Sequence, residues 1–250
     1  MSSATSQVKG LCGGVIKVDT PKQDDGSMQG LGGVSHAVMA SSSTLWENGT
    51  VLSYSFFGGT PFQRKKVMDV MGEWTWYANI TFKQMAENDA NATIRITFDP
   101  KKGSWSYVGN LAKTCVGPAP TMNFGWIDDD DSISKKERGV ILHEFGHVLG
   151  LMHEHESPAR SGIIRLKERE IIQYYSEKQG WDEATVRSQI LDVYTKDSVS
   201  NYSQFDPTSI MMYFMPGSMN EGGVDIHETT ELSSFDKGNF QHSITTNLAD

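Results

Sequence analysis

The chain of 250 residues is 38% hydrophobic and 21% charged, and its formal net charge at pH 7 is −9. A chain of this size buries a sizeable core without covalent staples, which excludes the class of small disulfide-stapled scaffolds. An acidic surface repels nucleic acid and anionic lipid, so we expect neither nucleic acid nor a membrane as the main partner.

Two features bear on the cellular compartment, and they point in opposite directions. Cys12 and Cys115 are the only cysteines, and the sequence shows neither a signal-peptide pattern nor an apolar run long enough to cross a membrane. These observations predict a cytoplasmic or non-classically exported protein. Secretion is the alternative, because four N-x-Ser/Thr sequons are acceptors for N-glycosylation; they begin at Asn48, Asn79, Asn91 and Asn201.

Residues 1–45 are rich in serine and glycine and contain one short apolar run. This composition predicts a flexible leader or a removable pro-segment, with the folded domain at residues 46–250. Within that domain, β-branched and aromatic runs predict strands, and apolar residues at helical spacing predict helices. Strands are expected at 51–57, 80–82, 92–98 and 121–127, and helices from Pro61 to about Ala78, over 164–178 and 182–194, and from Leu232 onward.

An acidic run, Asp128 to Asp131 followed by Ser132, precedes the stretch that carries the histidine motif. We expect these carboxylates to cap the free N–H groups at the start of a helix, where they also complement the helix dipole. A calcium site is the alternative.

The most informative stretch runs from His143 to His153. His143 and His147 lie on one face of a helix, because four residues make slightly more than one turn, and both rings can reach one metal ion. Gly150 allows the helix to stop and the chain to reverse, which returns His153 as a third ligand. The pattern therefore predicts one Zn²⁺ bound by three histidines, against the alternative of a core helix that merely contains histidines.

Three imidazoles leave the fourth position of a tetrahedral zinc to water, as in catalytic sites. Glu144 lies beside the ligand face and is free to take a proton from that water, whose pKa falls to about 7 on zinc. The hydroxide then attacks a polarised carbonyl. We expect the remaining histidines to be surface or hydrogen-bonded residues and not ligands; they are His36, His155, His227 and His242.

The motif H-E-x-x-H-x-x-G-x-x-H resembles that of the metzincin zinc endopeptidases, which carry a methionine turn further along the chain. Ser209 to Tyr213 resembles that turn, with Met211 as the residue beneath the metal. Glu154 after the third histidine, together with Tyr213, is similar to the astacin family. The resemblance implies that Tyr213 is a displaceable fifth zinc ligand that stabilises the transition state.

The resemblance spans roughly residues 46 to 240 and implies an α+β fold. In this fold a twisted mixed five-stranded sheet and long helices form the N-terminal lobe, and an irregular C-terminal lobe ends in a final helix. Residues 103–109 resemble the edge strand of the family, to which an extended peptide can add as one more strand. The chain departs from the family in having two cysteines in place of the usual four, and Met212 where many members have histidine.

Together, the motif and the resemblance predict a monomeric zinc-dependent endopeptidase. It would hydrolyse an extended polypeptide by attack of a zinc-bound water that Glu144 activates. Two alternatives stay open: a catalytically silent zinc-binding recognition module that keeps the cleft, and an effector protease of narrow specificity.

Cys12 is a candidate latency ligand. Glycines on both sides allow its backbone to approach a cleft closely, and a thiolate is a strong zinc ligand that would occupy the water position. Related pro-segments more often use an aspartate, so Asp24 or Asp25 competes for this role. A bond between Cys12 and Cys115, or no latch at all, are the other possibilities.

Overall fold

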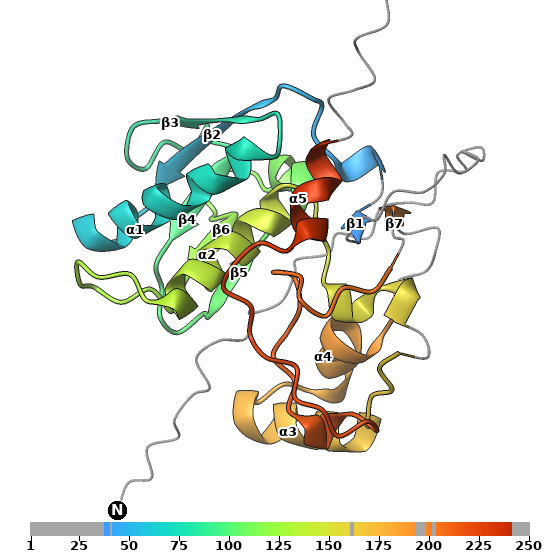
Figure 1. Cartoon of the computed structure of the whole chain (residues 1–250). Coiled ribbons are helices and arrows are strands. Elements are labelled where there is room, and N and C mark those ends of the chain that lie inside the picture. The colour runs from blue at the N-terminus through green and yellow to red at the C-terminus, as the bar shows by residue number, and fades with distance from the viewer. Residues whose placement is uncertain (1–37, 41, 161–162, 194–198, 202–203, 242–250) are drawn as a thin grey trace, which may run out of the picture.

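The computed structural model describes residues 38–40, 42–160, 163–193, 199–201 and 204–241 (Figure 1). The strands are β1 (Met39–Ala40), β2 (Val51–Phe56), β3 (Thr81–Gln84), β4 (Ile94–Thr97), β5 (Ser104–Ser106), β6 (Met122–Phe124) and β7 (Val199–Asn201). The α-helices are α1 (Pro61–Met71), α2 (Lys135–Val148), α3 (Glu168–Gln179), α4 (Glu183–Val186) and α5 (Ser234–Gln241). No helix in the described ranges is long and apolar enough to cross a membrane.

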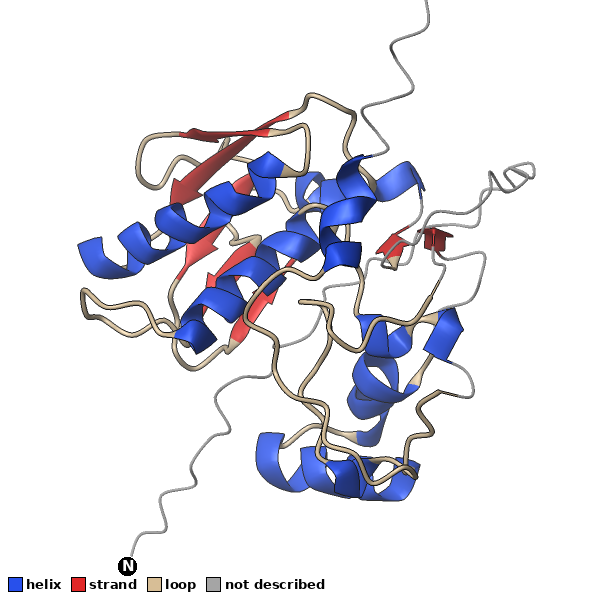
Figure 2. Ribbon diagram, viewed as in Figure 1, coloured by secondary structure: helices blue, strands red, loops and turns tan. Residues whose placement is uncertain are grey.

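Five strands form one mixed sheet in the order β3-β2-β4-β6-β5. The first four run parallel to their neighbours, and β5 is antiparallel to β6 at the edge. Helices α1 and α2 cover this sheet (Figure 2), and their apolar faces share one core with it, in which Trp74 and Phe145 are fully buried. The α+β class and the mixed five-stranded sheet predicted from the resemblance are confirmed.

Helix α1 is shorter than the sequence predicted. It ends at Met71, and a 3₁₀-helix from Gly72 to Trp76 follows, so the regular spacing of apolar residues continues through a change of helix type. The tighter turn places Trp74 in the core, where its indole Nε1 donates to the carbonyl of Leu142 on α2 at 3.1 Å. The expected end near Ala78 was wrong because both helix types keep apolar side chains about three residues apart.

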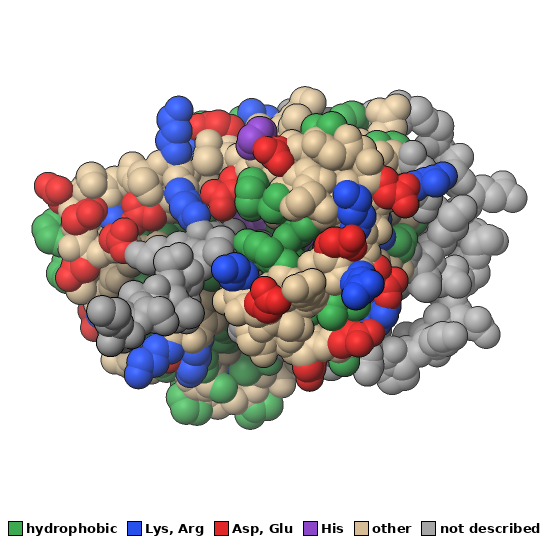
Figure 3. All heavy atoms as spheres, turned by 90° about the horizontal axis from the view of Figure 1, so that it is seen from below, with side chains coloured by type: hydrophobic (Ala, Val, Ile, Leu, Met, Phe, Trp, Pro, Cys, Tyr) green, Lys and Arg blue, Asp and Glu red, His purple; other side chains and the backbone are tan. Residues whose placement is uncertain are grey.

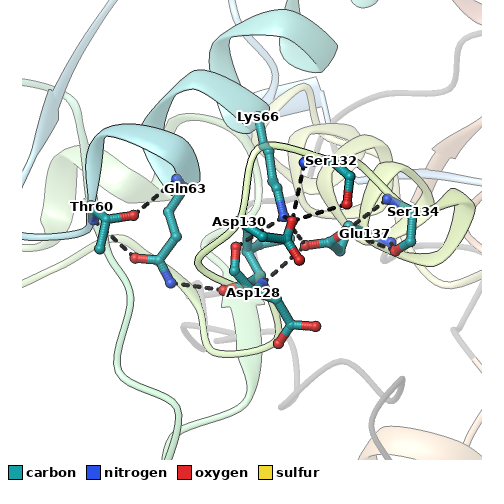
Figure 4. A network of polar contacts seen from close by, with 9 residues as sticks. Thr60, Gln63, Lys66, Asp128, Asp130, Ser132, Ser134 and Glu137 are labelled. Carbon is teal, nitrogen blue, oxygen red and sulfur yellow. Dashed lines mark hydrogen bonds and ion pairs between the residues drawn. The ribbon is translucent and has the colours of Figure 1, made fainter.

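The start of α2 also differs from the prediction. Ser134, and not the acidic run before it, is the N-cap, and it forms a reciprocal capping box with Glu137. The acidic loop is held instead by the buried ammonium of Lys66, which donates to the Asp128 carbonyl at 2.9 Å, to Asp130 at 2.9 Å and to Glu137 at 2.7 Å (Figure 4). A lysine on α1 therefore supplies the positive charge that this loop needs.

Replacing Lys66 with methionine is expected to destabilise the fold by about 3–5 kcal/mol, because it leaves the buried carboxylate of Glu137 without its cation. Burial raises the pKa of Glu137, but hydrogen bonds from Lys66 and Ser134 outweigh burial and hold it below the usual value. The stabilisation is therefore present above the unfolded-state pKa and lost as pH falls through the folded-state pKa. Urea unfolding across this acidic range measures both effects.

Lys65→Met is the matched control for that experiment. Lys65 pairs with Asp69 one turn away on the same helix, but both side chains are exposed, so its loss should cost less than about 1 kcal/mol. Equal losses for the two lysines, or a loss for Lys66→Met that does not shrink on acidification, would contradict the assignment.

The C-terminal lobe has a separate core around α3 and α4. Helix α3 begins at Glu168, four residues later than the predicted start at 164, and ends at Gly180, whose φ of 69° is left-handed. The predicted helix over 182–194 is α4 followed by one π-helical stretch, Arg187–Leu191, and it stops at Leu191. Both helices predicted for this lobe are therefore present, with shorter bounds.

Residues 38–40 and helix α5 complete the N-terminal lobe. Val38, Met39 and Ala40 are buried, and β1 pairs antiparallel with β7. Residues 38–40, assigned to the leader from composition, thus contribute to the fold, while residues 1–37 lie outside the described part of the chain. Helix α5 lies in the upper part of the molecule and not in the lower lobe (Figure 1), and Leu232 just before it joins the upper core.

Candidate active site

Helix α2 presents His143, Glu144 and His147 near its C-terminal end. The two imidazole rings are one turn apart, with centroids 4.8 Å from each other, and both are largely buried. The helix therefore positions the first two predicted ligands on one face, as the spacing of four residues requires.

A reversal at Gly150 brings the third histidine to the same place. Gly150 has φ of +99°, and a Cβ atom there would lie 2.4 Å from the side chain of Leu45, so the turn needs glycine for two reasons. The backbone N–H of Gly150 donates to the His147 carbonyl at 2.9 Å. Beyond the turn, Nε2 of His153 lies 3.1 Å from Nε2 of His147.

These three histidines fit a zinc ion. One nitrogen from each lies within 4.8 Å of the others, and a tetrahedral zinc with bonds of about 2.0–2.1 Å separates its ligand nitrogens by about 3.4 Å. Nε2 of His143 is buried without a hydrogen-bond partner among the described residues. Burial also lowers the pKa of His143 to about 4, which keeps its ring in the neutral form that binds metal.

The predicted methionine turn lies directly beneath this group. Met211 is fully buried, and a Cβ atom on Gly146 of α2 would lie 2.5 Å from its sulfur, so the glycine leaves the room that the methionine fills. The carbonyl of Ile210 in the turn is 2.8 Å from Nδ1 of His143. Met211 is therefore packed against the helix that carries His143 and His147, in the turn whose Ile210 carbonyl faces His143.

Asp236 on α5 holds the turn from behind. Its carboxylate accepts from the hydroxyl of Ser209 at 2.7 Å and from the backbone N–H of Ile210 at 2.8 Å. Burial is the main cause that raises the pKa of Asp236. The sequence does contain a capping signature, Ser233 with Asp236 three residues later, but it contains no sign of the contact with the turn.

Tyr213 lies against the histidines, as predicted. Its ring is 4.4 Å from that of His153 and 5.9 Å from that of His143, measured between centroids. Its other close neighbour is His155, whose ring is stacked at 4.5 Å. His155 is fully buried and not a surface residue, and its Nε2 is 3.0 Å from the Gln189 carbonyl, so the hydrogen-bonded alternative for this residue was the right one.

Glu144 contributes to the wall of a cavity that opens to solvent beside the histidines. The walls combine apolar side chains with one ion pair, Lys136 to Glu228 at 3.4 Å. The cavity is lined by Trp126, Lys136, Gly139, Val140, His143, Glu144, Ile210, Met212, Tyr213, Phe214, Glu228, Thr229 and Thr230. In the view from below, hydrophobic side chains gather near the middle of the molecule, with acidic and basic ones interspersed around them (Figure 3).

Glu154, the residue after the third histidine, is fully buried. Burial raises its pKa to about 8, although hydrogen bonds from the backbone N–H groups of Asp206 at 3.0 Å and Val38 at 3.3 Å act in the opposite direction. Glu154 thus ties the metal-binding turn to Val38, just before β1, and to Asp206, just before the methionine turn. The sequence identified this residue only as a sign of family, without a structural role.

The remaining predicted site residues lie outside the described residues. Cys12, Asp24 and Asp25 all fall within residues 1–37, so a latency ligand stays a prediction. Cys115 is described, and it is a free thiol.

Fold and site together define a zinc-binding α+β domain of the metzincin type. The family model for Astacin, a family of peptidases, matches residues 38–241. The chain belongs to the astacin family, and its domain is a zinc metalloendopeptidase domain.

Solved structures support this assignment. The structure of myroilysin is 33% identical to this chain at a TM-score of 0.76, and the match covers 84% of this chain and 99% of that one. High choriolytic enzyme 1, a hatching enzyme zinc-protease from Oryzias latipes (medaka fish), is 18% identical at a TM-score of 0.52, and that match covers 79% of this chain and 92% of that one. At this low identity, the second likeness shows the fold alone.

Curated relatives match over a smaller part of their length. Tolloid-like protein 1 of Mus musculus is 29% identical over 136 residues, which is 53% of this chain and 12% of that protein. Zinc metalloproteinase nas-30 of Caenorhabditis elegans is 28% identical over 149 residues, which is 58% of this chain and 18% of that protein. The likeness to these larger proteins is therefore confined to one domain.

Proposed function

We propose that this chain hydrolyses internal peptide bonds of polypeptides, with zinc held by His143, His147 and His153 and with Glu144 as the general base. The observation that carries this proposal is that three histidine nitrogens lie close enough together to bind one metal ion, next to a cavity whose wall includes Glu144. When bound, zinc polarises the scissile carbonyl and lowers the pKa of the attacking water.

The protein residues then have separable roles. Glu144 accepts the proton of the attacking water and delivers it to the nitrogen of the departing amine. Tyr213, packed against His153, places its hydroxyl to donate to the oxyanion that develops on the carbonyl. The apolar cavity walls take one substrate side chain and exclude water from it.

An extended substrate fits the edge of the sheet. Strand β5 pairs with β6 on one side, and its other side pairs with no strand in the described part of the chain. The N–H and C=O groups of such an edge strand can bind a peptide backbone as a further strand, which presents alternate side chains toward the cleft. This mode of binding requires an unfolded or flexible stretch of substrate.

Hydrolysis of unfolded casein tests the proposal. The full chain should cleave casein, lose activity in excess chelator and regain it when Zn²⁺ is restored, because the ligands are preformed. The Cys12→Ser variant belongs beside it, since a leader that blocks the site would mask activity in the full chain. Stoichiometric zinc binding without cleavage by either protein would favour the silent recognition module.

A further inference from the structure

The three histidine ligands differ in what their Nδ1 atoms contact. Those of His143 and His147 each face a backbone carbonyl oxygen, at 2.8 and 2.9 Å. Nδ1 of His153 instead lies 3.3 Å from a carboxylate oxygen of Glu156, and both of these side chains are fully buried. His153 therefore has a carboxylate oxygen beside its Nδ1, where the other two ligands have a backbone carbonyl oxygen.

Local geometry explains how Glu156 reaches this position. His153 is not on α2; it has extended backbone angles, φ −63° and ψ 127°, and is the N-cap residue of a short 3₁₀-helix, Glu154–Glu156. A 3₁₀-helix has three residues per turn, so side chains three apart eclipse each other. The carboxylate of Glu156 is thereby placed beside the ring of a ligand that no α-helix holds.

The surroundings of Glu156 balance its charge. An ionised carboxylate in a fully buried position is costly unless groups of opposite charge or hydrogen-bond donors face it. The guanidinium of Arg160 is buried nearby and donates to the carbonyls of His155 at 2.6 Å and Leu191 at 3.0 Å. Burial lowers the pKa of Arg160, while the charges of Glu156 and Asp192 act to raise it. The fixed cation is thus close enough to support a carboxylate here.

A rival arrangement uses the same residues. Ligand atoms of His153, His155 and Glu156 also lie within 4.8 Å of one another, which is the geometry of a possible second metal site. That site would need His153 to serve two metals, since its Nε2 already faces His147 at 3.1 Å. Nε2 of His155 faces the Gln189 carbonyl, so the second metal would bind the other nitrogen of that ring. A hydrogen bond between Glu156 and the ring of His153 does not require the His153 ring to serve two metals.

We propose that Glu156 is a positioning residue of the metal site. Its carboxylate accepts a hydrogen bond from Nδ1–H of His153, holds Nε2 of that ring toward the other two ligands, and makes this nitrogen a stronger electron donor to zinc. The proposal rests on the zinc site of the proposed function, but it concerns metal affinity and not the hydrolytic step.

Zinc affinity measures this role directly. In competition with a chromophoric chelator, full-length Glu156→Ala should bind zinc about 10- to 100-fold more weakly than the unmodified chain, and Glu156→Gln should fall between them, since the amide keeps a neutral acceptor. The absorption bands of the cobalt-substituted protein should shift in both variants. Glu137→Gln is the matched control, a buried carboxylate at the far end of α2, and should lower the melting temperature while zinc affinity stays within about twofold.

Several results would overturn the proposal. One is a zinc affinity of the folded Glu156→Gln and Glu156→Ala variants within about threefold of that of the unmodified chain. The others are an unchanged absorption spectrum of the cobalt-substituted variants, or two zinc ions bound per unmodified chain and one per variant chain. If Glu156→Ala fails to fold, the glutamine variant alone decides through affinity and spectrum. If the variants keep the zinc affinity of the unmodified chain and the unmodified chain cleaves casein, only the role of Glu156 is refuted. If the variants bind zinc more weakly but the unmodified chain cleaves no casein, only the proposed function is refuted.

Discussion

Glu144→Ala is expected to lower kcat/KM by at least about 10²-fold, and by about 10⁴-fold or more if the same carboxylate both takes the proton from water and delivers it to the leaving amine. Zinc binding should persist, because the ligand nitrogens belong to His143, His147 and His153 and the carboxylate is not among them. The measurements are steady-state cleavage of a quenched fluorescent peptide and zinc content by atomic absorption.

Glu137→Ala provides a control on the same helix, seven residues earlier. Glu137 is buried like Glu144 but does not line the cavity, so its loss should affect stability far more than turnover per folded molecule. Residual activity of Glu144→Ala within about tenfold of the unmodified chain would mean that another group acts as the base. Loss of zinc from the variant would instead make Glu144 part of the metal site.

Tyr213→Phe is expected to lower kcat by about 10²–10³-fold with little change in KM, since one donor to the developing oxyanion is lost while substrate binding is kept. The ring itself should stay in place, because it is packed against the imidazoles of His153 and His155 and phenylalanine keeps those contacts. Separate determination of kcat and KM is the measurement.

Tyr175→Phe is the matched control for this prediction. Tyr175 is also buried and belongs to the same core as Tyr213, but its ring stacks on Trp181 whereas that of Tyr213 packs against His153 and His155. A rise in KM at constant kcat for Tyr213→Phe would show that the hydroxyl binds substrate in the ground state. Similar losses for the two variants would indicate a general effect on packing.

Local sequence rules succeeded where a structural feature depends on neighbours along the chain. The pairing of His143 with His147 follows from the helical repeat, and the return of His153 follows from a left-handed glycine at Gly150. The same rules failed where one sequence pattern fits more than one local conformation. The helix from Pro61 becomes a 3₁₀-helix at Gly72 while its apolar residues keep their spacing. The N-cap of α2 is Ser134 and not a residue of the acidic run.

Glu156 is an instructive intermediate case. It is only three residues from His153, yet its role depends on the chain forming a 3₁₀-helix there. An extended or α-helical continuation would have placed the two side chains differently, and nothing in the spacing distinguishes these conformations. Proximity in sequence was therefore insufficient to reveal the contact.

By itself, the sequence placed His143, Glu144 and His147 on one helix and returned His153 to them, because these positions depend on helical periodicity and on one glycine turn. The class of fold followed from the resemblance of the motif to a known family. Only the tertiary structure decided what supports these residues. Lys66 reaches Glu137 across 71 residues, and Asp236 reaches Ser209 across 27. Such contacts depend on how the helices and the methionine turn pack together, and packing brings residues together without leaving a periodic pattern in the chain.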